Sequence, residues 1–271
     1  MKTLDKFNIK IIPFVLLISF LDFLFFHFPF YKFVFNNVDY KSLNGTILII
    51  TLIILMLVVN SFVFFLIFFL SRLVGKFLLV LFFISNAVAI YFVNTYSVII
   101  DESMIGNVLN TNYAEATSFF SIKLILYIII LGVIPSIYII KAKIINVTVR
   151  RFLVITSLTL LFILALIFAN ASNWLWIDKN SKTLGGLAMP WCYSVNTSLF
   201  YVHKYKENEK EILLPNATIK DSQKTVVVLV IGESARSQNF SLYGYGKNTN
   251  PLLSKMPDIF HFNATSCATY T

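Results

Sequence analysis

The chain has 271 residues, of which 58% are hydrophobic and only 13% are charged. Soluble domains carry about 25% charged residues, so half that share excludes a water-soluble fold, and the excess apolar surface must face lipid. The net charge of +9 does not indicate nucleic-acid binding, because the positive residues lie between long apolar runs and not on one polar face. Composition therefore predicts a membrane protein without a nucleic-acid partner.

Five apolar runs are long enough to cross a hydrocarbon core, which takes about 20 residues. Together they predict a five-helix membrane domain over residues 1–169. The runs are 11–30, 46–69, 77–96, 124–140 and 152–169, of which the fourth is the shortest. Asp22 is the only acid inside a span. An intramembrane carboxylate is a candidate functional group, but the favoured interpretation is that Asp22 pairs with a neighbouring helix.

The orientation follows from the Lys and Arg residues in the connections, which concentrate on the cytoplasmic side. Basic residues are dense before the first run and in the second and fourth connections, at Lys2, Lys6, Lys10, Arg72, Lys76, Lys141, Lys143, Arg150 and Arg151. The first connection has only Lys32 and Lys41, and the third, 97–121, has acids and no basic residue. This alternation predicts a cytoplasmic N-terminus, and five crossings then place everything after Ala169 outside, which in a bacterium is the periplasm.

The sequence becomes mixed and polar after Ala169, and residues 170–222 are predicted to be a periplasmic linker or bridging segment. The unbroken β-branched run 225–231 is typical of a strand buried on both faces in an α/β domain. Glu233 follows it, where open α/β sheets form their sites, although an acid there is more often the start of a helix. Residues 241–246 predict a turn and 248–253 a capped helix, before a second strand at 259–262.

The last nine residues, 263–271, gather hydroxyl side chains directly after that strand. Such hydroxyls can cap a helix, or serve as nucleophiles when a metal lowers their pKa. Spacing alone does not choose between these two interpretations.

The ordered series G-E-S-A-R (232–236), N-F-S-L-Y-G-Y (239–245), T-N-P-L-L (249–253) and S-C-A-T-Y-T (266–271) closely resembles the phosphoethanolamine transferases of Gram-negative bacteria. That family includes lipid A modifying enzymes that confer polymyxin resistance. The resemblance implies five transmembrane helices followed by a periplasmic α/β/α domain of the alkaline-phosphatase/sulfatase type, begun here at 223–271. It also implies zinc, phosphatidylethanolamine as the donor, and lipid A or lipooligosaccharide as the acceptor.

The same resemblance assigns roles to five residues. Glu233 falls on a zinc ligand, and Thr271 falls on the threonine that attacks the donor phosphate and contacts zinc. In the third connection, Asn107, Thr111 and Glu115 fall on positions that contribute to the phosphoethanolamine site. These three recur at i, i+4 and i+8, so on one continuous helix they would share a face. The bland alternative is the polar face of an interfacial helix.

Two departures from the family pattern matter. Ala268 stands where the family usually has Gly, which adds a methyl group beside the nucleophile. The resemblance also implies further zinc ligands and donor-binding histidines downstream of Thr271. We therefore expect these 271 residues to be an N-terminal fragment that is inactive alone. The family's partner for Cys267 also lies downstream, so the partners of Cys192 and Cys267 stay open.

Three alternatives remain at this point. A phosphoglycerol transferase of the lipoteichoic-acid-synthase type shares the layout, but the third connection and the S-C-A-T-Y-T motif argue against it. A sulfatase is disfavoured because its modification motif is missing. A non-enzymatic membrane protein with a degenerate outer domain is the third.

Overall fold

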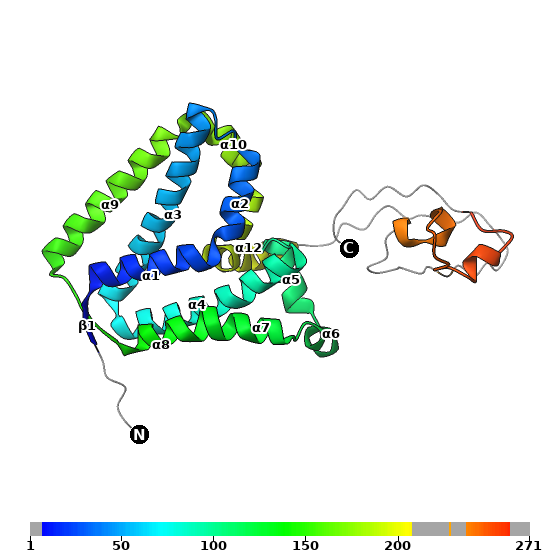
Figure 1. Cartoon of the computed structure of the whole chain (residues 1–271), viewed down its shortest axis with the longest axis horizontal. Coiled ribbons are helices and arrows are strands. Elements are labelled where there is room, and N and C mark those ends of the chain that lie inside the picture. The colour runs from blue at the N-terminus through cyan, green and yellow to red at the C-terminus, as the bar shows by residue number, and fades with distance from the viewer. Residues whose placement is uncertain (1–6, 208–227, 229–236, 261–271) are drawn as a thin grey trace, which may run out of the picture. The chain divides into compact units, whose positions relative to one another are not determined.

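The computed structural model describes residues 7–207, 228 and 237–260 (Figure 1). The chain divides into two units, Met1–Glu209 and Lys210–Thr271. The first unit is almost entirely helical, and the described part of the second contains only short 3₁₀ turns.

The five predicted apolar runs are confirmed as helical segments of membrane-spanning length and composition. Four of them are single spans, and the first is a helix pair bent by 65°. The spans are α1 and α2 (Ile11–Phe26 and Phe28–Asn37), α3 (Leu43–Leu70), α4 (Arg72–Tyr96), the α7–η1–α8 helix (Ile122–Lys141) and α9 (Val149–Ala169). The described residues thus hold four helices long and apolar enough to cross a membrane, and the bent pair makes a fifth when it is counted as one span.

The break in the first crossing lies at His27, between α1 and α2. Pro29 occupies the first turn of α2. Because proline lacks an N–H and clashes with the preceding turn, it is tolerated at a helix start but interrupts a continuous helix. The predicted apolar run 11–30 is therefore helical on both sides of a break that was not predicted, and the sequence signal for the break was this single proline.

The fourth crossing is one rod made of α7 (Ile122–Tyr127), the π-helical turn η1 (Ile128–Val133) and α8 (Ile134–Lys141). It runs beside α4 (Figure 1). At Gly132 the two helices approach so closely that an added Cβ would lie 3.2 Å from the Cα of Ile84. Small residues at such crossings allow membrane helices to pack through their backbones.

Aromatic side chains fill the centre of the bundle where α1, α3 and α4 meet. Phe14 and Phe68 pack edge to face at 5.1 Å between ring centroids, and Phe26 and Phe83 do so at 5.6 Å. All four are buried. By contrast, no residue of α9 is buried, although Phe152 near its start stacks on Phe69 of α3 at 3.7 Å.

The basic connections gather at one end of the bundle. There β1 (Phe7–Lys10) pairs in parallel with β2 (Ala142–Ile145), with Phe7 opposite Ala142. Lys76 at the start of α4 donates to the carbonyl of Ile140 at 2.8 Å. This small sheet was not predicted, because two four-residue strands so far apart in sequence give no local signal.

Short helices cover the opposite end of the bundle. They are α5 (Glu102–Asn110), α6 (Tyr113–Ser118), η2 (Ala171–Asn173), α10 (Trp174–Lys179), α11 (Ser181–Leu187) and α12 (Trp191–Glu207). The segment predicted as a linker is thus helical up to Glu207, and α11 and α12 pack on α2 and α5. It belongs to the same unit as the spans, although the predicted boundary at 222 lies outside the described residues.

In the second unit, η3 (Ser237–Asn239) and η4 (Ser241–Tyr243) precede Gly244, which ends the turn with φ +90°. The predicted turn at 241–246 is confirmed. Thr249 fixes the loop by donating to the carbonyl of Asn239 at 2.6 Å and accepting from the Ser241 N–H at 3.0 Å. The predicted helix over 248–253 is wrong, because the chain makes a turn there and then η5 (Leu253–Lys255). The predicted strand 225–231, apart from Val228, and all but the start of strand 259–262 lie outside the described residues.

Candidate functional site

The predicted substrate-binding residues of the third connection lie on two helices and not on one. Asn107 is in α5, Thr111 caps its end, and Glu115 is in the first turn of α6. Thr111 Oγ1 donates to the carbonyl of Asn107 at 2.6 Å, while Asn112 Oδ1 accepts from the Glu115 N–H at 2.9 Å. Asn and Thr side chains compete with the helix for backbone partners and favour caps. The expectation of one shared helical face is therefore corrected, although all three residues stay in one connection.

The other two predicted site residues, Glu233 and Thr271, lie outside the described residues, as does Cys267. Within the described ranges, no three His, Cys, Asp or Glu side chains come together to hold a metal ion. The predicted zinc site stays a prediction that rests on the motifs.

Asp101 fixes the start of α5. Its carboxylate accepts from the Met104 N–H at 3.0 Å and from Ser103 Oγ at 2.8 Å, and it pairs with Lys182 of α11 at 3.0 Å. Burial raises the pKa of this carboxyl, but the backbone bond, the Ser103 hydroxyl and the Lys182 ammonium together outweigh burial and hold its pKa below the ordinary value. From the sequence, Asp101 was recognised only as one acid of the third connection. In the structure it is the charged N-cap of α5.

Helix α12 holds the third connection in place from the other side. Asn196 donates to the carbonyl of Ile100 at 2.9 Å, and Phe200 packs on α5 at Gly106. A Cβ at Gly106 would lie 3.1 Å from the Phe200 ring, so the glycine allows this close approach. Further along, His203 Nδ1 lies 2.7 Å from Glu102 Oε1. The predicted substrate connection is therefore part of a packed α5–α12 layer.

A crevice of about 870 Å³ opens between α5, α11 and α12. Its lining combines charged groups with an apolar wall. The residues that matter here are Asp101, Glu102, Lys182, Trp191, Val195, Leu199, Phe200, His203 and Lys204. Sequence reasoning missed this crevice, because the α12 residues come from the segment that was predicted to be a linker.

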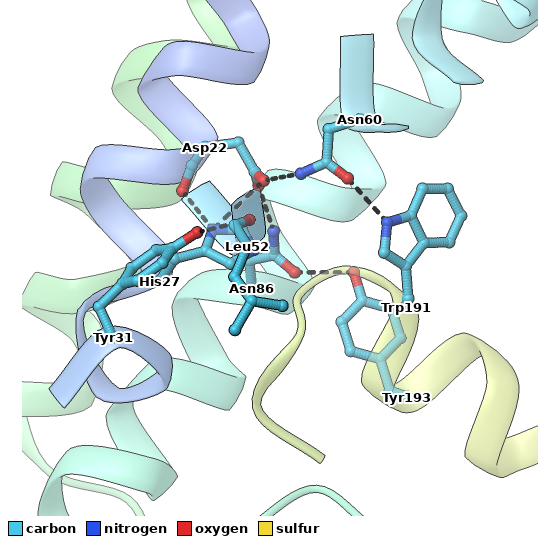
Figure 2. Close-up of polar contacts among 8 residues, drawn as sticks. All are labelled: Asp22, His27, Tyr31, Leu52, Asn60, Asn86, Trp191 and Tyr193. Carbon is cyan, nitrogen blue, oxygen red and sulfur yellow. Dashed lines mark hydrogen bonds and ion pairs between the residues drawn. The ribbon is translucent and has the colours of Figure 1, made fainter. Parts of the chain in front are cut away.

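The first turn of α12 is tied to the middle of the bundle by a buried polar network centred on Asp22 (Figure 2). Asn60 of α3 and Asn86 of α4 each donate to one Asp22 carboxylate oxygen at 2.8 Å. Their amide oxygens accept from Trp191 Nε1 at 2.7 Å and from the Tyr193 hydroxyl at 3.0 Å.

Asp22 is thus bonded to neighbouring helices, as the favoured interpretation predicted. The two asparagines and the docking of α12 were not predicted. Lone amides inside apolar runs were their only sequence signal. Beside them, the Cys192 thiol is buried and its pKa is raised by burial to about 12, so this thiol is not a reactive group of the site.

The structure is that of an integral membrane domain with a layer of short helices, α5, α11 and α12, at one end. Charged side chains line the crevice in this layer. Comparison with known proteins identifies the class. Residues 56–205 match the family model of the phosphoethanolamine transferases EptA/EptB, and residues 225–271 match the sulfatase family model. The chain belongs to the EptA/EptB phosphoethanolamine transferase family, and it carries the beginning of a sulfatase domain.

Individual relatives agree with this assignment. Phosphoethanolamine transferase EptA of Helicobacter pylori is 40% identical over 250 residues, which are 91% of this chain and 46% of the relative. Phosphatidylethanolamine transferase Mcr-1 of Escherichia coli is 32% identical, over 74% of this chain and 39% of that protein. The chain therefore spans about half or less of the length of these relatives.

A solved structure shares the fold. The integral membrane lipooligosaccharide phosphoethanolamine transferase EptA of Neisseria meningitidis aligns with a TM-score of 0.73 at 24% identity, covering 89% of this chain and 46% of that one. The predicted combination of membrane helices and an incomplete sulfatase domain is confirmed by these matches.

Proposed function

We propose that the protein containing this chain transfers phosphoethanolamine from phosphatidylethanolamine to lipid A or lipooligosaccharide. The observation that carries the proposal is the joint match of the membrane half to the EptA/EptB family and of the last segment to the sulfatase family in one chain. The match of the membrane half favours this activity over phosphoglycerol transfer, since it covers the connection with Asn107, Thr111 and Glu115.

We infer that this chemistry takes place in the periplasm, at the outer face of the inner membrane. Among the segments that flank and connect the five apolar runs, Lys and Arg residues are densest at the end of the bundle that holds β1 and β2, and the positive-inside tendency supports a cytoplasmic location for this end. The opposite end carries α5 and α12. The donor lipid can then approach from within the bilayer.

Thr271 is the proposed nucleophile. Its Oγ forms a bond to the donor phosphorus while the bond from phosphorus to the glycerol oxygen breaks, and diacylglycerol leaves after taking up a proton. This step leaves phosphoethanolamine bonded to Thr271 Oγ. An acceptor phosphate or hydroxyl oxygen then attacks the same phosphorus, the bond from phosphorus to Thr271 Oγ breaks, and Thr271 regains its proton. Glu233 and Thr271 would contribute to holding a zinc ion, which lowers the hydroxyl pKa and offsets charge on the phosphate. Asn107, Thr111 and Glu115 would bind the phosphoethanolamine group through an amide, a hydroxyl and a carboxylate.

The test is mass spectrometry of lipid A from a Gram-negative host that produces the whole gene product. We expect lipid A to gain phosphoethanolamine, and Thr271→Ala to abolish the gain. Labelled phosphatidylethanolamine and phosphatidylglycerol supplied to purified whole enzyme separate the two donor classes. Unmodified lipid A together with phosphoglycerol transfer, or modification that survives Thr271→Ala, would refute the proposal.

A further inference from the structure

Helix α12 exposes an apolar stripe outside the spans of the bundle. Trp191, Val195 and Leu199 recur at i, i+4 and i+8, which places them on one helix face, and all three line the crevice between α5, α11 and α12. Val195 and Leu199 are 51% and 40% exposed. The crevice volume of about 870 Å³ lies within the roughly 300–1,000 Å³ of small-molecule sites.

Charges of both signs surround this stripe. Lys182 pairs with Asp101 at 3.0 Å and keeps 63% of its side chain exposed. Lys204 lies over the ring of Phe200, with Nζ 5.6 Å from the centroid. On α5, Glu102 directs Oε1 to His203 and stays one-third exposed. The crevice therefore offers two ammonium groups, two carboxylates, of which Asp101 pairs with Lys182, and an apolar wall within one layer of the fold.

The first turn of α12 brings this wall to the bilayer. Trp191 donates to Asn60, which lies well inside the spanning helix α3 (Figure 2). The apolar end of the crevice thus starts among the membrane helices, while Glu102 and His203 lie toward the other end of α12. A ligand that follows the crevice is apolar at one end and charged at the other, as membrane lipids are.

We propose that this crevice binds the zwitterionic headgroup of a phospholipid, with the phosphate at Lys182 and Lys204, the primary ammonium at Glu102, and the glycerol and first acyl carbons along Trp191, Val195 and Leu199. The proposal rests on the proposed function, because it gives the donor lipid a place of entry whose lining does not include Asn107, Thr111 or Glu115. The acids disfavour a purely anionic lipid, since a carboxylate beside a second negative charge is repelled.

The test uses Trp191 as a reporter in the detergent-solubilised 271-residue chain. The chain has three Trp residues, so a Trp174→Phe/Trp176→Phe background leaves only the one that lines the crevice. Dihexanoyl-phosphatidylethanolamine should change its fluorescence saturably, and dihexanoyl-phosphatidylglycerol should bind more weakly. An unchanged spectrum, or equal affinity for the two lipids, would overturn the proposal.

Matched variants locate the binding groups. Lys204→Gln should weaken phosphatidylethanolamine binding about tenfold, as expected for one charge-assisted contact. Lys206→Gln, on the same helix but outside the crevice lining, should leave binding unchanged. Glu102→Gln should weaken phosphatidylethanolamine binding and strengthen phosphatidylglycerol binding, because it removes the repulsion between the carboxylate and the anionic lipid. Equal effects of the two lysine variants would overturn the proposal.

The outcome is separable from that of the proposed function. If whole enzyme transfers phosphoethanolamine while Lys204→Gln leaves its dependence on lipid concentration unchanged, the crevice proposal fails and the function stands. If the lipid binds as expected but no transfer occurs to lipid A, the crevice proposal stands and the proposed function fails.

Discussion

The membrane unit and the segment that follows it differ in how sequence relates to structure. The membrane unit, Met1–Glu209, has a core of packed aromatic rings and a buried polar network that joins three spanning helices to α12. Within the second unit, none of the residues described at 237–260 is buried, and hydrogen bonds such as those of Thr249 fix a loop. Yet the motifs that carry the proposed chemistry lie in the second unit. The packing contacts that define the fold are concentrated in the membrane unit, whereas the motifs of the proposed chemistry are concentrated in the second unit.

Replacing Thr271 should produce the largest effect, and this effect should be on transfer activity and not on stability. Thr271→Ala removes the proposed nucleophile, so transfer by the whole enzyme should fall at least about a thousandfold. Its thermal unfolding in detergent should match that of the unmodified protein. Thr271→Ser is the matched control and should retain part of the activity. Equal loss in both variants, or a fall in unfolding temperature, would contradict the assigned role.

Replacing Asp22 should show the opposite pattern, a loss of stability. Asp22→Leu leaves the Nδ2 groups of Asn60 and Asn86 without their acceptor. Because a buried polar group that loses its partner costs about 1–3 kcal/mol, we expect the unfolding free energy to drop by a comparable amount. Unfolding in mixed micelles followed by circular dichroism measures this. Asp22→Asn, which keeps one acceptor oxygen, should cost less. An unchanged unfolding free energy in Asp22→Leu would show that the network does not stabilise the packing of these helices.

A bulky residue at Gly106 should separate α5 from α12. Gly106→Leu must displace the Phe200 ring, and overpacking typically costs about 1–3 kcal/mol. A matched Gly185→Leu change, where an added Cβ meets nothing within 4 Å, should cost less. Thermal unfolding of both variants measures the difference, and equal shifts would contradict the close approach at Gly106.

The smallest effect is expected from the Asp101 cap, as a pH dependence. Its pKa is lowered in the folded protein, so its stabilisation is fully present above the unfolded pKa of about 3.9 and is lost as pH falls through the folded value. Asp101→Asn should therefore lower the unfolding temperature at pH 7, and its difference from the unmodified protein should shrink as the pH falls below about 3.9. The ion pair between Lys182 and Asp101, in which the Lys182 side chain is exposed, contributes at most about 1 kcal/mol to the stability. A constant difference between the two proteins over that pH range would rule out the charged cap.

Much of the fold follows from residue patterns, and the exceptions have physical reasons. Apolar length alone gives the five crossings, because the bilayer fixes how long a span must be. It does not reveal the bend at His27 or the break at Thr111, since a single Pro29 or Asn112 side chain decides each of them. It also does not reveal that α12 returns to the bundle, because Trp191 and Tyr193 find their partners more than a hundred residues away.

The candidate site shows the same division. The order of the motifs identifies Glu233 and Thr271 as candidate site residues. Their spacing alone does not decide between a helix-capping role and a catalytic role. The crevice beside α12 has no motif, because its charges come from three helices and meet only after folding. Residues that act through a motif can be read from sequence, and residues that act through packing cannot.

The Asp22 network also has a consequence for how the protein is made. Helix α1 emerges from the ribosome before α3 and α4, so Asp22 reaches the bilayer before Asn60 and Asn86 do. A lone carboxylate at the centre of a span costs about 2.5–3.5 kcal/mol on insertion. Helix α1 should therefore settle fully only when its two later partners have entered, and the start of α12 should dock last. The Asp22 network therefore favours one order of assembly, in which α12 docks after α1, α3 and α4 have come together.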